Sequence, residues 1–104
     1  MNKWNIVYSE QAAQDLRDIY EYIAYNLLEP ETAAKQVQRI MADILKLETL
    51  PMRHQLYYKS PWKERGLRVL PTDNFLSFYL PIETQNTVAI VRIMYGKRDI
   101  DAQL

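Results

Sequence analysis

The chain has 104 residues, no cysteine and a formal net charge of zero. This length suits a single domain, here residues 1–104, built around one core. Without cysteine there can be no disulfides or thiolate metal sites, and no apolar run approaches the roughly 20 residues that cross a bilayer. We therefore expect a cytoplasmic protein with no membrane partner.

The first half reads as a short strand followed by two helices. Alternation over residues 3–8 predicts the strand, and Ser9 is a suitable N-cap for the helix after it. Apolar residues then recur every three or four positions through 12–27 and through 33–47, with Pro30 at the start of the second run. The short link near residues 26–29 favours an antiparallel helical hairpin, which Pro51 ends.

After His54 the apolar period changes to that of strands, expected at residues 55–59, 67–70, 75–82 and 87–95. Residues 60–65 read as a polar loop, and turns at 72–74 and 83–86 make the following strands antiparallel. Pro81 should lie at an edge or a bulge, because it cannot donate a ladder hydrogen bond. The predicted class is α+β: an N-terminal strand and an antiparallel helical hairpin packed on a small, mostly antiparallel sheet, in the order β-α-α-β-β-β.

Charge divides the chain in two. Residues 1–50 hold five Lys and Arg against eight Asp and Glu, a net of −3, and residues 51–104 hold eight against five, a net of +3. Two ordinary solvated faces would give this pattern, and so would a basic sheet face that binds an anionic partner. We expect the sheet face away from the helices to be partly wet and to gather the basic residues.

Four cations near the strand ends are candidate contacts. Arg68 and Arg92 each stand between apolar neighbours and should point away from them, either as solvated or ion-paired residues or as anion contacts. Lys97 and Arg98 follow the last strand, where they could share a patch with Arg68.

Other polar residues suggest structural roles. The carboxylates Asp15, Asp18, Glu21 and Asp43 are expected on a solvated helix face, because no histidine or cysteine joins them as a metal site. His54 is expected to be structural. No phosphate loop, dinucleotide fingerprint or nucleophile elbow occurs, so we expect no metal and no cofactor.

The chain resembles the RelE/ParE superfamily of bacterial toxins from type II toxin–antitoxin modules, and within it the ParE-like branch. The resemblance is carried by the order of several short segments: residues 15–24, Ala33-Ala34 with the apolar stripe after them, and residues 47–51, 66–70, 74–79, 90–93 and 96–99.

The resemblance implies a cognate antitoxin that holds the toxin inactive. An amphipathic helix could lie in the groove of the helical hairpin, and an acidic tail could meet the basic sheet. The expected contacts are the apolar residues Leu16, Tyr20, Ile23, Val37, Ile40 and Met41.

The resemblance also implies one of two targets. ParE-like members inhibit DNA gyrase, arrest growth and are not enzymes; the target contacts would include Arg65, Arg68, Arg92, Lys97 and Arg98. RelE-like members are endoribonucleases that cut messenger RNA on the ribosome, for which Arg68, Tyr95, Lys97 and Arg98 are the candidates.

Two departures favour the ParE-like branch. Leu76 and Leu104 stand about where RelE-like nucleases offer an arginine and a tyrosine. A non-toxic binding module is a third reading. No sequence-specific DNA binding is expected of the toxin alone.

Overall fold

The computed structural model describes residues 3–97 and 100–104. Its elements in chain order are β1 (Asn5–Tyr8), α1 (Glu10–Glu21), a π-helical turn (Tyr22–Asn26), α2 (Pro30–Leu45), α3 (Trp62–Arg65), β2 (Arg68–Thr72), β3 (Phe75–Ile82), β4 (Thr87–Tyr95) and α4 (Ile100–Gln103). Short 3-10 turns occur at Lys46–Glu48, Pro51–Arg53 and Glu83–Gln85. Within these described residues, no helix is both long and apolar enough to cross a membrane.

The four strands form one sheet in the order β1-β4-β3-β2. Strands β2, β3 and β4 are antiparallel, and β1 lies parallel to β4, so the predicted mostly antiparallel sheet is confirmed. β1 reaches only as far as Ile90, which leaves the end of β4 without a strand partner on that side. The register shifts between Phe78 and Tyr79, so Val91 forms a bulge at this point.

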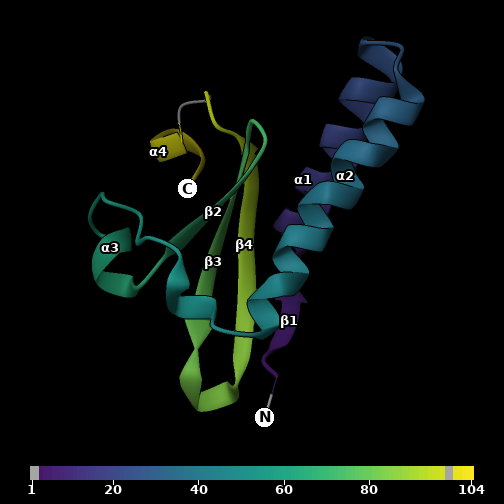
Figure 1. Ribbon diagram of the computed structural model, residues 1–104. Helices are drawn as coiled ribbons and strands as arrows, with labels where there is room; N and C mark the ends of the chain where they lie inside the picture. The colour runs from purple at the N-terminus through teal and green to yellow at the C-terminus, as the bar shows by residue number, and fades with distance from the viewer. Residues whose placement is uncertain (1–2, 98–99) are drawn as a thin grey trace.

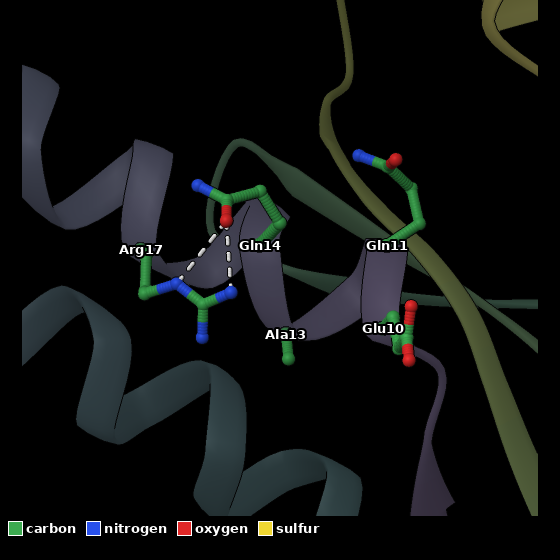
Figure 2. A pocket seen from close by; sticks show the side chains of 5 residues that line it. All are labelled: Glu10, Gln11, Ala13, Gln14 and Arg17. Carbon is green, nitrogen blue, oxygen red and sulfur yellow. Dashed lines mark hydrogen bonds between the residues drawn. The ribbon is translucent and has the colours of Figure 1, made fainter.

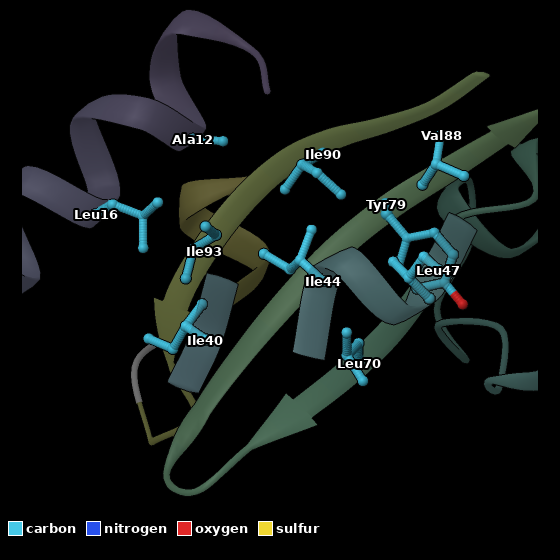
Figure 3. Packing of buried hydrophobic residues seen from close by; sticks show 10 residues of the cluster. All are labelled: Ala12, Leu16, Ile40, Ile44, Leu47, Leu70, Tyr79, Val88, Ile90 and Ile93. Atoms are coloured by element: carbon cyan, nitrogen blue, oxygen red, sulfur yellow. The ribbon is translucent and has the colours of Figure 1, made fainter. Parts of the chain in front are cut away.

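The predicted helical hairpin forms as the local sequence dictates. Ser9 caps α1, since the backbone N–H of Ala12 donates to Ser9 Oγ at 3.0 Å, and Pro30 is the first residue of α2. α1 and α2 lie together on one face of the sheet (Figure 1). The core between these helices and the sheet (Figure 3) contains Ala12, Leu16, Ile40, Ile44, Leu47, Leu70, Tyr79, Val88, Ile90 and Ile93.

The opposite face of the sheet is covered as well, which corrects the expectation of a partly wet, basic face. A second buried cluster contains Tyr57, Leu67, Phe78 and Met94. Trp62 of α3 and Ile100 of α4 pack against this cluster, on the side of the sheet away from the hairpin (Figure 1). Apolar residues on both sides of the strands therefore leave little of this face for solvated cations.

Two predicted segments differ in detail. Residues 55–59 do not form a strand; Leu56 makes a single bridge to Arg68, although the Tyr57 N–H donates to the Leu67 carbonyl at 2.7 Å. The polar loop predicted at residues 60–65 contains the short helix α3. The prediction for Pro81 is confirmed, because β3 beyond Tyr79 pairs with β4 alone.

Candidate functional site

Helix α1 covers the part of β4 that β1 leaves open. The backbone N–H of Ser9 donates to the Ile90 carbonyl at 2.9 Å, and Ser9 Oγ donates to the Val91 carbonyl at 2.9 Å. Six residues further along the chain, Asp15 Oδ2 accepts the backbone N–H of Ile93 at 2.9 Å. Ser9 and helix α1 therefore form hydrogen bonds with the backbone groups of β4 that a neighbouring strand would otherwise bind.

Arg92 completes this arrangement. Its Nε donates to Asp15 Oδ2 at 2.8 Å and its Nη2 to Asp15 Oδ1 at 3.1 Å, while Nη1 donates to the Gln103 carbonyl of α4 at 2.7 Å. The prediction of a solvated Asp15 is wrong, since its side chain is only 8% exposed, and that of Arg92 is 17% exposed. The guanidinium is thus occupied inside the protein rather than presented to a target.

Arg68 is also held internally. It lies on the sheet face that the helices cover, opposite Tyr79, and its Nη1 donates to the carbonyls of Met52 and His54 at 2.9 and 2.7 Å. These bonds fix the segment that links α2 to the second half of the chain. Its predicted place on a wet face beside the strand ends is therefore wrong.

Tyr79 and His54 lie close to this Arg68 contact. The Tyr79 hydroxyl donates to the Pro51 carbonyl at 2.6 Å, and the rings of Tyr79 and His54 meet edge to face at 6.3 Å. Burial raises the pKa of Tyr79 to about 12. Burial, followed by the neighbouring Arg53 cation, lowers the pKa of His54, and Asp43 opposes this more weakly. The lowered pKa favours the neutral form of His54, which makes this side chain a poorer proton donor.

The remaining candidates do not join a common cluster. Arg65 Cζ lies 5.2 Å from the Trp62 ring centroid, Tyr95 packs edge to face on Phe75, and Lys97 is exposed beyond the end of β4. Arg98 lies outside the described residues. Among the described candidates, Arg65, Arg68 and Arg92 contact separate partners, so these three do not form the expected basic rim.

A shallow apolar groove does form between α1 and α2. It has a volume of about 230 Å³ and is lined by Leu16, Arg17, Tyr20, Glu21, Val37 and Met41. Four of the six predicted antitoxin contacts are in this lining. Ile40 is fully buried and can only support the groove from beneath, and Ile23 is half-buried outside it.

A second hollow lies along the first turns of α1 (Figure 2). It measures about 460 Å³ and is lined by Glu10, Gln11, Ala13, Gln14 and Arg17. Arg17 donates to Gln14 Oε1 through Nε at 3.3 Å and Nη2 at 2.8 Å, so this polar surface is partly bonded to itself. Arg17 lines both hollows, which places them next to each other along α1.

Residues 6–100 match the sequence profile of a family described as the ParE toxin of the type II toxin–antitoxin system, parDE. The chain belongs to this ParE toxin family. The match confirms the expected resemblance. Comparison with curated proteins finds no significant match.

Solved structures share the fold of this ParE-family chain. A chromosomal ParDE toxin–antitoxin system from P. aeruginosa has a TM-score of 0.74 and 23% identity, covering 91% of this chain and 98% of the other. A RelBE toxin–antitoxin complex from Mycobacterium tuberculosis has a TM-score of 0.64 and 17% identity, covering 91% and 93%. The intact E. coli RelBE complex has a TM-score of 0.56 and 11% identity, covering 91% and 99%.

Proposed function

We propose that this ParE-family chain arrests growth by inhibiting DNA gyrase, without being an enzyme itself. The supporting observation is the internal use of both strand arginines. Arg92 is held by Asp15 and the Gln103 carbonyl, and Arg68 by two loop carbonyls. A ribonuclease needs free cations to stabilise the charge of a phosphorane and a general base for the ribose hydroxyl. Neither arginine is available for that work.

A cognate antitoxin completes the proposal. The solved relatives with similar folds include toxin–antitoxin complexes. The α1–α2 groove suits an amphipathic helix, because its apolar floor is open while Arg17 and Glu21 line it as well. Met41, 45% exposed, adds a flexible apolar contact that adapts to a partner.

Inducing the chain in cells without antitoxin tests the target. We expect growth to stop and thymidine incorporation to fall before methionine incorporation, because gyrase inhibition blocks replication first. Primer extension on translated transcripts should show no new cuts. Early loss of translation with fresh cuts would instead identify a ribosome-dependent endoribonuclease. Normal growth at normal protein levels would identify a non-toxic binding module.

A further inference from the structure

The far end of the α1–α2 hairpin extends past the sheet (Figure 1) and leaves four large apolar side chains in water. The exposed fractions are 56% for Tyr22, 68% for Tyr25, 52% for Leu27 and 80% for Leu28. These four residues lie within positions 22–28, and large apolar side chains exposed together mark interaction sites on soluble proteins. We call these four residues, together with the carboxylates Asp18, Glu21, Glu29 and Glu31, the hairpin tip.

The backbone of the hairpin tip is unusual in two places. Residues Tyr22–Asn26 form a π-helical turn, a feature found frequently at functional sites. Leu28 has a φ of +56°, a left-handed conformation that is unfavourable for a residue with a Cβ atom. Glycine or asparagine would adopt this turn at lower cost.

The charge of the hairpin tip defines its partner. No Lys or Arg occurs between Arg17 and Lys35, so the four carboxylates of this stretch have cations only at its two ends. In the described part of the chain, none of them forms an ion pair: Asp18 accepts from Gln14, and Glu29 accepts from Thr32. Tyrosine rings beside carboxylates bind Lys and Arg well, through the ring face and through charge. The complementary surface is therefore cationic.

We propose that the hairpin tip is the toxin surface that docks on a Lys- and Arg-rich surface of DNA gyrase. This rests on the proposed function. An enzyme that acts on duplex DNA must present cations to its phosphates, which is the chemistry that the hairpin tip complements. Arg68 and Arg92 offer no competing surface, because both are bonded internally. The antitoxin groove shares Glu21 with the hairpin tip, but Tyr25, Leu28 and Glu29 are not in its lining.

Binding of purified toxin to gyrase and inhibition of supercoiling test this docking. In the double variant Tyr25→Ala/Leu28→Ala and in Glu29→Lys, we expect both activities to fall tenfold or more. Affinity for the cognate antitoxin should stay unchanged, which shows that the fold is intact. Wild-type binding should weaken between about 50 and about 300 mM salt, and less steeply in Glu29→Lys.

Matched controls come from similar residues elsewhere. Tyr58 and Leu50 are 72% and 73% exposed, and Leu50 also has a positive φ, so Tyr58→Ala/Leu50→Ala should inhibit gyrase like wild type. Glu83→Lys is the charge control. Full inhibition by the tip variants would overturn the docking proposal and leave gyrase as target. If the tip variants lose only their affinity for the antitoxin, the docking proposal is overturned and the hairpin tip is a binding surface for the antitoxin. A wild-type chain that neither binds nor inhibits gyrase would overturn the proposed function, and the docking proposal with it.

Discussion

Asp15 of α1 and Arg92 of β4, separated by 77 positions, form a nearly buried ion pair with two parallel contacts. The same carboxylate accepts the Ile93 N–H and a side-chain bond from Gln11, and the same guanidinium reaches the Gln103 carbonyl of α4. One pair thus joins α1, the open edge of β4 and α4. Two charges that read as surface residues in the sequence instead hold the fold together.

Replacing Asp15 with asparagine should destabilise the protein by about 2–4 kcal/mol. The change leaves the Arg92 cation nearly buried without its counter-ion and weakens the acceptor for the Ile93 N–H. Urea denaturation followed by circular dichroism measures the effect. Asp18→Asn, on the exposed side of the same helix, is the control and should change stability by less than about 0.5 kcal/mol. Equal effects in both variants would refute a special role for Asp15.

Two buried hydroxyls in the sheet should respond in opposite directions. Ser77 Oγ has no hydrogen-bond partner within the described residues, so Ser77→Ala should stabilise by about 1 kcal/mol. Thr72 Oγ1 donates to Asp43 Oδ2 at 2.7 Å, so Thr72→Val should destabilise by about 1–2 kcal/mol. Thermal melts of the two variants beside wild type make the comparison. A destabilised Ser77→Ala would show that its hydroxyl has a partner.

Alkaline pH should weaken the fold through Tyr79. Burial raises the pKa of Tyr79 to about 12, whereas an unfolded tyrosine titrates near 10. Below about pH 10, Tyr79 is protonated in both the folded and the unfolded chain, so its contribution to the free energy of unfolding is complete. Above about pH 10, the unfolded chain loses this proton first, so the stability of the fold falls as pH rises towards about 12. We expect a loss on the order of 2 kcal/mol across this window in wild type that Tyr79→Phe does not show.

Urea titrations of both proteins at successive alkaline pH values measure this difference. At neutral pH, Tyr79→Phe should already be less stable by about 1 kcal/mol, since the Pro51 carbonyl loses its donor. Parallel stability curves for the two proteins above pH 10 would contradict the raised pKa.

A charge placed in the α1–α2 groove should block the antitoxin. Met41→Glu is expected to weaken antitoxin binding by tenfold or more, because a carboxylate would be buried against an apolar helix face. Met41 is 45% exposed, so the free toxin should keep its stability. Isothermal titration calorimetry measures the affinity, and Leu45→Glu, 56% exposed and outside the groove lining, is the control. Equal loss in both variants would place the antitoxin elsewhere.

Local signals in the sequence predicted the elements well. Ser9 caps α1, Pro30 opens α2, and β3 and β4 have the predicted bounds of residues 75–82 and 87–95. Capping, the fixed φ of proline and the period of apolar residues act within a few positions, so they can be read from the chain. The short link near residues 26–29 and the turns at 72–74 and 83–86 likewise predicted the helical hairpin and the mostly antiparallel sheet.

The arginine contacts were not predictable in the same way. The alternation of polar and apolar residues around Arg68 and Arg92 predicts that each arginine points away from its apolar neighbours. It does not predict which element covers the side of the strand to which the arginine points. Arg92 meets Asp15 because β1 has only four residues against nine in β4, so α1 comes to lie on the open strand edge. The sequence already predicted a shorter strand at residues 3–8 than at residues 87–95. This difference in length indicates an open edge on β4 only once β1 is known to pair with β4 in parallel.

Supercoiling of relaxed plasmid by purified gyrase, titrated with the purified chain, tests the central claim most directly. We expect inhibition at micromolar toxin and its loss when the toxin is first mixed with an equimolar amount of its cognate antitoxin. Unimpaired supercoiling by a folded, antitoxin-binding chain at that concentration would contradict the claim that gyrase is the target.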